Sequence, residues 1–484
     1  MKRILNFLPL LFLPFLIHSS TLNDTSNPDE HIKFDNYKLK INGLSHEIQT
    51  CRVSAMPLNQ IYPGYNRPLY QTELAGFSSW DLKGSTFVEI ESKEAIKSVK
   101  IRPLSLGIKP QIKGNKITFR LDKPQKFVVE VNGFHHALHL FANAPETNIP
   151  EQNTPNVRFF GPGEHIIGNT ELHSNESVYI DAKAVVYGNF FANDASNIHI
   201  FGRGILNVIK LPRGNGALNF NRCSNISIEG IILTEPNAWC FSMFGCNNVN
   251  INNIKLIGLW NYNTDGIDIC NCQNVKVEDC FIRSFDDALV VKGVVSYAEL
   301  PVSNIHFKNN IVWCDWGKAL EIGAETVAPE ISNIVFENCD IIRTLGLAMD
   351  ITSSDNADIH DIRFEDIRLE IDKWNPTPKI QAIKNENYTI DSLQNFCPML
   401  VQIQILKTDY TQVAERSKIH DITFKNIKIT TENKFPISSF AGYDETHKVS
   451  NVVFDNLWIN NHHITQVKKA NFSIKSFVNR IKFY

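Results

Sequence analysis

The sequence has no excess of either charge and little cysteine for its length. It contains 48 Lys plus Arg against 51 Asp plus Glu, so it lacks the basic surplus that binding a nucleic-acid backbone requires. Ten cysteines in 484 residues are too few for a small disulfide scaffold, and stability must come mainly from a hydrophobic core. Beyond the first 17 residues, no apolar run approaches the length of a transmembrane helix. We therefore expect neither a nucleic-acid partner nor a membrane span in the mature chain.

The first residues have the order of a secretory signal. Two basic residues precede the apolar run Ile4–Ile17, and the small residues Ser19 and Ser20 follow, as in a signal peptide with its cleavage zone. The alternative, an N-terminal anchor helix, is disfavoured because the run is short for a bilayer. We expect residues 1–20 to be a signal peptide and the mature protein to be secreted or periplasmic.

A short segment recurs along most of the chain, as in Asn197-Ile-His-Ile-Phe-Gly. Its copies begin at Asn197, Asn225, Asn248, Asn274, Asn304, Asn333, Asp361, Asp421 and Asn451. The intervals run from 23 to 30 residues, apart from one of 60, and such a period indicates a solenoid. The interval of 60 is either two turns or one turn with an insertion between about Lys373 and Gln412.

Each repeat is expected to form a coil of β-strands. Apolar and polar residues alternate within each copy, and the linkers lack helical periodicity. Parallel stacking pairs each strand with a neighbour about 4.8 Å away, while inward Ile, Val, Leu and Phe fill the interior. Crossover connections prefer the right hand. The sequence thus predicts an all-β fold whose main part, residues 156–484, is a right-handed parallel β-helix.

Three cysteines share one position in the repeat. Cys223, Cys246 and Cys272 each lie two residues before a repeat Asn, so they should stack on successive coils. Parallel Cβ directions do not favour disulfides. We expect buried free thiols that pack as small hydrophobic residues.

The region before the repeats predicts a separate β-sandwich over residues 30–150. Short alternating segments with turn signals lie at 86–91, 99–103, 116–121 and 127–132, which indicates antiparallel sheets. The Pro- and Asn-rich stretch 144–155 is the expected linker.

The end of the chain carries apolar residues at helical spacing. Ile474, Phe477 and Ile481 predict a helix that caps the last coil.

Acidic residues gather at one place on the solenoid. Asp265 and Asp268 belong to one coil, and Asp286 and Asp287 follow Asp265 by 21 and 22 residues, one coil later. Crowded carboxyls raise at least one pKa, which suits a general acid near neutral pH. An ionised partner is then available to activate water. A single Asp would be explained as a turn cap, but carboxyls at one-coil spacing favour catalysis.

These two motifs resemble those of polygalacturonases, glycoside hydrolase family 28. The family's Asn-Thr-Asp matches Asn263-Thr264-Asp265, and its Asp-Asp matches Asp286-Asp287 at the same separation. The resemblance implies that Asp286 is the general acid and that Asp265 and Asp287 hold and activate water in an inverting single displacement. The N-terminal sandwich looks more like the dextranase and isopullulanase group, family 49. Together they imply an O-glycosyl hydrolase that acts on a polysaccharide or oligosaccharide.

Two departures from family 28 concern substrate charge. Lys318 stands where the family has the His of Gly-His-Gly, and Asp350-Ile351-Thr352 stands where it has Arg-Ile-Lys. Arg and Lys there would neutralise a uronate carboxylate, whereas Asp repels it. A neutral glycan, or one with its charge outside this subsite, is therefore expected.

The remaining candidates for chemistry lie near these motifs. The expected substrate-binding residues are Asp268, Lys292, Trp316, Lys318, Glu321 and Asp350. Trp316 lies nearest the acidic motif and offers a ring face for a sugar. Trp239, Trp260 and Trp313 either do the same or belong to the core.

No metal and no cofactor are expected. His135-His136-x-x-His139 lacks the Glu of a zinc-protease helix and lies in a strand-rich region. His462 and His463 are expected at the surface.

Two other functions fit the same scaffold. A lyase would take a uronate C5 proton with Lys292 or Lys318 beside acidic calcium ligands. A carbohydrate-binding or adhesive solenoid would need the repeat alone. The separation between the Asn-Thr-Asp and Asp-Asp motifs, which matches that of family 28, favours hydrolysis. The sequence leaves the sugar, the linkage, endo or exo action and the oligomeric state open.

Overall fold

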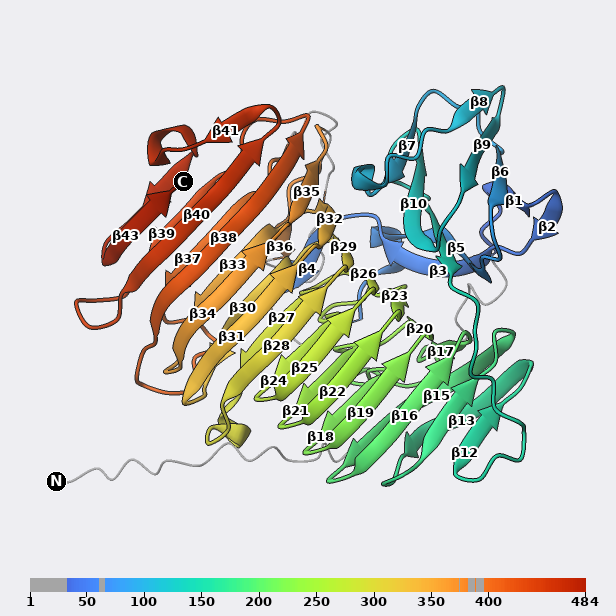
Figure 1. Cartoon of the computed structure of the whole chain (residues 1–484), viewed down its shortest axis with the longest axis horizontal. Coiled ribbons are helices and arrows are strands. Elements are labelled where there is room, and N and C mark those ends of the chain that lie inside the picture. Colours follow the sequence, from blue (N-terminus) through green and yellow to red (C-terminus); the bar gives the residue numbers. More distant parts are fainter. Residues whose placement is uncertain (1–32, 61–65, 374, 382–387, 389–395) are drawn as a thin grey trace. The chain divides into compact units, whose positions relative to one another are not determined.

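The repeats wind into one long parallel sheet that coils along most of the chain (Figure 1). The computed structural model describes residues 33–60, 66–373, 375–381, 388 and 396–484. The predicted signal peptide lies outside these residues. Within the described part, no helix combines the length and the apolar character that crossing a bilayer demands.

Two five-stranded sheets come first in the chain. The first sheet has the order β2 (Leu44–His46), β1 (Tyr37–Ile41), β6 (Thr86–Ser92), β9 (Lys116–Leu121), β8 (Gln111–Lys113). The second has the order β3 (Gln49–Ser54), β5 (Thr72–Asp81), β11 (Leu138–Asn143), β10 (Gln125–Val131), β7 (Val99–Arg102). The predicted strands are present, but β11 and β5 pair in parallel. The expectation of antiparallel pairing was wrong at this pair, because β5 and β11 are not consecutive and the chain between them passes through both sheets.

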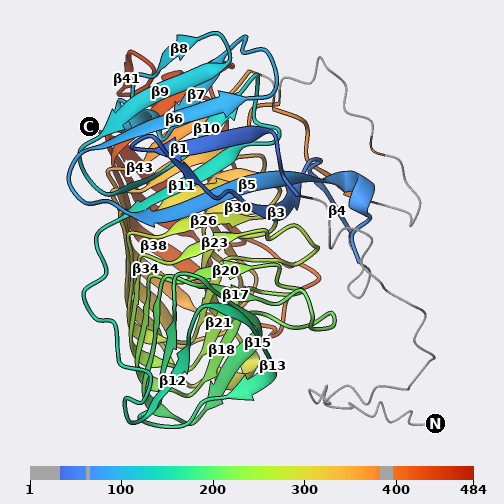
Figure 2. The same cartoon turned by 90° about the vertical axis from the view of Figure 1, so that its right-hand side faces the viewer.

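The second sheet is buried on both faces. Every residue of β11 is buried, whereas β6 alternates buried and more exposed positions. One face of the second sheet packs on the first sheet, and the other packs on the β-helix (Figure 2). There the rings of Phe141 and Phe281 lie 5.2 Å apart. A sheet covered on both sides needs apolar residues throughout its strands.

The β-helix has three faces. The face formed by the sequence repeats contains β12 (Val157–Phe160), β14 (Ser177–Ile180), β16 (Ser196–Gly202), β19 (Ser224–Glu229), β22 (Asn247–Asn252), β25 (Gln273–Glu278), β28 (Val302–Lys308), β31 (Glu330–Glu337), β34 (Asp358–Glu365), the first part of β38 (Lys418–Thr431) and of β40 (Val449–Ile459), and β43 (Val478–Phe483). The face under the sandwich contains β17 (Ile205–Asn207), β20 (Ile232–Thr234), β23 (Lys255–Ile257), β26 (Phe281–Ser284), β29 (Ile311–Cys314), β32 (Asp340–Thr344) and β35 (Arg368–Ile371).

The third face carries the acidic residues, and we call it the acidic face. It contains the end of β15 (Ala184–Asn193), β18 (Leu218–Asn221), β21 (Phe241–Phe244), β24 (Ile267–Cys270), β27 (Leu289–Gly293), β30 (Lys318–Thr326), β33 (Leu347–Ser353), β37 (Met399–Ile405), β39 (Ser438–Ala441) and β42 (Phe472–Ile474). β13 (Gly163–Glu171) pairs with β15 at the start, and β41 (His462–Ile464) forms a hairpin with β40. In the described part of the chain, short 3-10 helices interrupt the strands at Leu69–Gln71, Leu104–Leu106, Val295–Tyr297 and Val467–Lys469. The prediction of a right-handed parallel β-helix preceded by a sandwich is confirmed.

The interior is built of stacked identical side chains. Phe307 and Phe336 stack with ring centroids 4.5 Å apart, and Phe336 and Phe364 with centroids 4.9 Å apart. The predicted cysteine ladder is present as well, because Cys223, Cys246 and Cys272 are buried and free. In these two ladders, residues of one repeat position pack on their own kind from coil to coil.

The repeat Asn has a backbone reason. Asn197, Asn225 and the later residues that begin each repeat, Asp361 and Asp421 included, all have φ between 53° and 59°. Asn and Asp tolerate this left-handed conformation better than other non-Gly residues. Their side chains also form a ladder, in which the Asn225 amide donates to Asn197 Oδ1 at 3.1 Å.

The 60-residue interval is a single turn with an insertion. β34 pairs directly with β38, and β33 with β37, so no extra coil lies between them. The insertion leaves the coil after β35 and contains β36 (Lys379–Gln381), which pairs with β4 (Leu58–Gln60). Residues 379–381 of the insertion thus pair with residues 58–60 of the N-terminal part.

The C-terminal helix prediction was wrong. Residues 472–474 and 478–483 form β42 and β43, which add to the β-helix. Phe477 lies between them with φ of 60°. Backbone pairing with the preceding coil satisfies the last segment better than a helix, which would leave that strand edge open.

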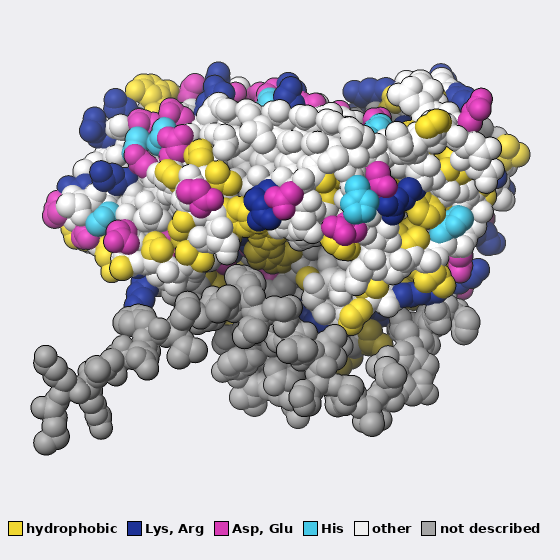
Figure 3. Space-filling view, turned by 90° about the horizontal axis from the view of Figure 1, so that it is seen from below, with side chains coloured by type: hydrophobic (Ala, Val, Ile, Leu, Met, Phe, Trp, Pro, Cys, Tyr) yellow, Lys and Arg dark blue, Asp and Glu magenta, His cyan; other side chains and the backbone are white. Residues whose placement is uncertain are grey.

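Residues Phe34–Tyr484 form one compact unit. A buried ion cluster joins the sandwich to the β-helix: Glu130 lies 2.9 Å from Arg102 of β7 and 3.0 Å from Arg343 of β32. The division into separate domains near residue 150 stays a prediction. Basic and acidic side chains are interspersed on the face shown in Figure 3.

Candidate active site

The predicted catalytic aspartates lie in turns that lead onto the acidic face. Asp265 precedes β24, and Asp286 and Asp287 precede β27 on the next coil. The Gly266 N–H donates to Asp287 O at 2.8 Å, which fixes the two turns side by side. The structure therefore brings these carboxyls onto adjacent rungs, as the spacing predicted.

Glycine permits the close approach of the third rung. A Cβ at Gly317 would lie 2.6 Å from the Asp287 backbone nitrogen and 2.7 Å from its Oδ1. Any larger residue would push this turn away from the aspartates. Gly317 thus allows the following residue, Lys318, to reach Asp287.

Asp287 is held in its ionised form. Its Oδ1 accepts the Lys318 N–H at 3.0 Å and lies 3.3 Å from the Lys318 ammonium nitrogen. Burial opposes ionisation, but the neighbouring Lys318 charge outweighs it and lowers the pKa of Asp287. A carboxylate that stays ionised at acid pH is suited to act as a base.

Asp286 has the opposite tendency. Burial, and then the charge of Asp287, raise the pKa of Asp286 to about 6. The side-chain amide of Asn59 donates to Asp286 Oδ2 at 3.3 Å. Neighbouring carboxyls with pKa values moved apart mark an acid and a base.

Asp265 shares a lysine with Asp268. The Lys292 ammonium lies 3.4 Å from Asp265 and 3.2 Å from Asp268. Burial, followed by the neighbouring Asp268 charge, raises the pKa of Asp265, and burial raises the pKa of Asp268 to about 7. The carboxyls around it raise the pKa of Lys292. One lysine cannot neutralise both carboxylates, so Asp265 and Asp268 together retain a proton near neutral pH.

Glu321 and Asp350 continue the acidic face beyond Lys318. They are paired in register on β30 and β33, and both are fully buried. Glu321 lies 3.0 Å from the Lys318 ammonium, and burial raises its pKa. Burial raises the pKa of Asp350 to about 6, although Asp350 accepts hydrogen bonds from Thr352 at 2.9 Å and Gln402 at 3.2 Å. The positions that carry positive charge in family 28 are thus neutral or acidic here.

The tryptophans divide between site and core. Trp316 is half-buried, and its ring lies 6.3 Å from that of Phe285, the residue before Asp286. Trp313 is fully buried under Arg283 and belongs to the interface with the sandwich. Lys292 lies 3.9 Å from the ring centroid of Trp239. Trp260 donates to Glu235 at 2.5 Å.

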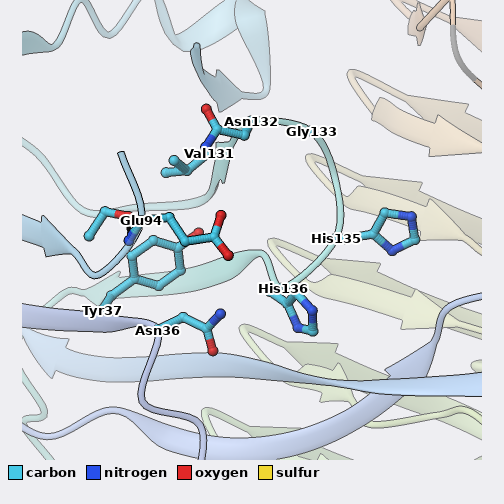
Figure 4. A pocket seen from close by; sticks show the side chains of 9 residues that line it. Asn36, Tyr37, Glu94, Val131, Asn132, Gly133, His135 and His136 are labelled. Carbon is cyan, nitrogen blue, oxygen red and sulfur yellow. Dashed lines mark hydrogen bonds between the residues drawn. The ribbon is translucent and has the colours of Figure 1, made fainter. Parts of the chain in front are cut away.

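The three sandwich histidines do not converge on one point. His135 pairs with Glu73 at 2.6 Å, and His136 lies 3.0 Å from Leu74 O; both line a cavity of about 110 Å³ (Figure 4). Burial and then Arg283 lower the pKa of His139 to about 3. Across the described residues, no cluster of His, Cys, Asp and Glu is arranged to hold a metal ion. His462 and His463 are exposed, as predicted.

Asn59 was missed by the sequence analysis. It lies 227 positions from Asp286 in the chain, outside the repeats and outside the predicted sandwich strands. No local pattern marks it, because its role depends on a long-range contact.

Comparisons with known proteins find relatives of the segment that carries this site. Residues 210–377, which include all three candidate catalytic aspartates, match Glycosyl hydrolases family 28. An exopolygalacturonase of Arabidopsis thaliana is 31% identical over 255 residues, which is 50% of each chain. A dextranase of Arthrobacter globiformis is 23% identical over 332 residues, 61% of this chain and 46% of its own. This chain thus spans about half the length of these curated relatives.

The solved structure of Dex49A from Penicillium minioluteum shares the fold. It matches with a TM-score of 0.67 at 13% identity and covers 93% of this chain and 94% of its own. The predicted resemblance, a family-28-like β-helix with an N-terminal arrangement like that of family 49, is confirmed.

Proposed function

We propose that this protein is a glycoside hydrolase that cleaves a polysaccharide or oligosaccharide by an inverting mechanism. One observation carries the proposal: Asp286 and Asp287 are adjacent and buried, and the pKa of Asp286 is raised to about 6 while that of Asp287 is lowered. The match of this segment to family 28 supports the same assignment. An acid and a base are thus both ready at mildly acidic pH.

In this mechanism each carboxyl has one task. Asp286 gives its proton to the glycosidic oxygen as the bond from that oxygen to the anomeric carbon breaks. Water forms the new bond to the same carbon from the opposite side and loses its proton to Asp287. Asp265, held by Lys292 at 3.4 Å, orients the water. No bond forms between sugar and enzyme, so the anomeric configuration inverts.

We also propose a neutral sugar beside the catalytic residues. Lys318 already contacts Asp287 and Glu321, and Lys292 already contacts Asp265 and Asp268. Neither ammonium is left to neutralise a uronate, and Asp350 adds a further carboxyl. The hydroxyl groups of a neutral ring suit such acceptors better than an anion does.

The lyase alternative is weakened by the lysines. Elimination needs a basic side chain to remove the C5 proton. Neighbouring carboxyls raise the pKa of both Lys292 and Lys318, so both stay protonated at neutral pH. We further propose that the protein acts outside the cytoplasm, where polysaccharides are found, which agrees with the signal-like order of residues 1–20.

The test is a screen of plant, algal and microbial polysaccharides with detection of new reducing ends. Hydrolysis by the wild type and its loss in Asp286→Asn supports the proposal. Products that absorb in the ultraviolet as unsaturated uronates would establish the lyase instead. Binding of a glycan without any cleavage would favour the non-catalytic solenoid.

A further inference from the structure

A short strand outside the β-helix reaches the candidate acid. β4 (Leu58–Gln60) lies in the connection between β3 and β5, and its Asn59 is buried. The Asn59 amide nitrogen lies 3.3 Å from Asp286 Oδ2. The acid is therefore contacted by a residue that the coils do not supply.

Strand pairing holds β4 in place. β4 runs parallel to β36, with Asn59 opposite Ile380. β36 is tied in turn to the active site, because the Trp316 indole N–H donates to Lys379 O at 2.8 Å. The two strands form a small sheet of their own.

Arg67 fixes the other end of this connection. Its guanidinium carbon lies 3.9 Å from the ring centroid of Phe285, the residue before Asp286. It also donates to Trp260 O at 2.8 Å, and its backbone N–H donates to Asn261 Oδ1 at 2.9 Å. Arg67 is buried, so the connection is anchored on the turns that carry the catalytic residues.

The amide of Asn59 has only one suitable orientation. Its Oδ1 accepts the Gln60 N–H at 2.8 Å, which leaves the NH₂ group directed at Asp286. A donor in this place interacts more strongly with an ionised carboxyl than with a neutral one. Asp286 becomes ionised when it gives up its proton, so the bond strengthens as the reaction proceeds.

We propose that Asn59 is a positioning residue for Asp286: it holds the carboxyl toward the glycosidic oxygen and stabilises the anion left after proton transfer. This inference rests on the proposed function of Asp286. Among the described residues, the other titratable groups that act on or contact Asp286 are Asp287, Lys318, Lys292, Asp265, Cys314 and Tyr410.

The test compares Asn59→Leu, which keeps the volume, and Asn59→Ala with the matched control Gln60→Ala on the same strand. We expect kcat to fall about 10- to 100-fold in both Asn59 variants, with KM changed less than about 2-fold. The alkaline limb of kcat/KM should move up by roughly 0.5–1 pH unit, because a donor to the carboxylate is lost. Gln60→Ala should match the wild type in both readouts.

A second measurement does not depend on turnover. Carbon-13 NMR of protein labelled at the aspartate carboxyls, with Asp286 assigned from Asp286→Asn, gives the pKa of Asp286 directly. A higher pKa of Asp286 in Asn59→Leu supports the contact, and an unchanged pKa together with unchanged kcat overturns it. A wild type that cleaves no glycan overturns the proposed function, whereas the titration still decides the Asn59 contact.

Discussion

Lys318 contacts one oxygen of Asp287, Oδ1, in two ways: its backbone N–H donates to Oδ1 at 3.0 Å, and its ammonium nitrogen lies 3.3 Å from the same atom. Family 28 has a His at this position, whose charge would change near neutral pH. The lysine keeps its charge throughout, because the carboxyls around it raise its pKa. The lowered pKa of Asp287 favours its ionised form into the acid range, so in the proposed mechanism the pH dependence is set largely by Asp286.

The first prediction is an acidic, bell-shaped pH profile. Activity should rise as Asp287 loses its proton, below the ordinary range of an Asp, and fall as Asp286 loses its proton at about 6. kcat/KM measured from pH 3 to 9 should thus peak between roughly pH 4 and 6. In Lys318→Gln the acid limb should move to higher pH, since Asp287 loses its neighbouring cation. An optimum above pH 7 would contradict the assignment.

The second prediction concerns stereochemistry. A single displacement by water inverts the anomeric carbon. Proton NMR of the first product, recorded before mutarotation, should show the anomer opposite to that of the substrate. Retention, or a trapped covalent adduct, would exclude the proposed roles of Asp265 and Asp287.

The third prediction separates activity from stability at Asp286. Asp286→Asn should lower kcat at least about 10³-fold, because the proton donor is lost. It should also melt a few degrees above the wild type at pH 8. In the folded protein the pKa of Asp286 is raised to about 6. The proton on Asp286 therefore stabilises the fold fully at pH values below the pKa of the unfolded state, and this stabilisation is lost as the pH rises through 6.

The size of that stability loss is roughly 2–3 kcal/mol when the unfolded pKa is about 3.9. The control is pH 4, where the wild-type carboxyl is already neutral and the two melting temperatures should agree. A variant that unfolds as readily as it loses activity would instead support a turn-capping role for Asp286.

The fourth prediction tests substrate charge. Unesterified polygalacturonate and its fully methyl-esterified form share one backbone and differ in charge. We expect any cleavage to be at least about 10-fold faster on the neutral form, because Lys318 and Lys292 already contact carboxyls and Asp350 adds a further one. Neutral glucans should be compared in parallel. Efficient cleavage of the unesterified polymer would show that positive charge reaches the subsite from elsewhere.

The fifth prediction concerns the contact between sandwich and β-helix. Glu130 is buried between Arg102 and Arg343, so Glu130→Ala leaves two guanidinium groups with a missing partner and should cost about 3–5 kcal/mol. The control is Glu432→Gln, at the exposed end of the same cluster, which should cost less than about 1 kcal/mol. Chemical denaturation measures both. Equal losses in the free energy of unfolding would show that the buried contacts of Glu130 stabilise the protein no more than the exposed contact of Glu432.

Much of the fold could be predicted from the repeat. Asn and Asp at the start of each coil specify a left-handed turn, and the alternation that follows specifies a strand with one buried face. The aspartates of the site could be predicted too, since a separation of 21 or 22 residues is close to one coil and places them on successive coils. The stacked cysteines followed from the same argument.

Features that depend on contacts between residues far apart in the sequence could not be predicted. The helical spacing of Ile474, Phe477 and Ile481 is real, but the open edge of the preceding coil favours strand pairing. Asn59 reaches Asp286 only because β4 pairs with β36, more than 300 residues later. Burial of Glu321 and Asp350, which fixes their charge, likewise follows from the assembled coils.

The pairing of β4 with β36 also suggests how such enzymes diversify. β4 lies in a connection of the sandwich and β36 in an insertion between coils, and the coils on either side of that insertion keep their register. Lengthening an excursion is inexpensive, since each doubling of a loop adds only about 0.6 kcal/mol of closure entropy. The segments that meet at the proposed catalytic aspartates can therefore change in length at little cost in stability while the coils hold the aspartates in place.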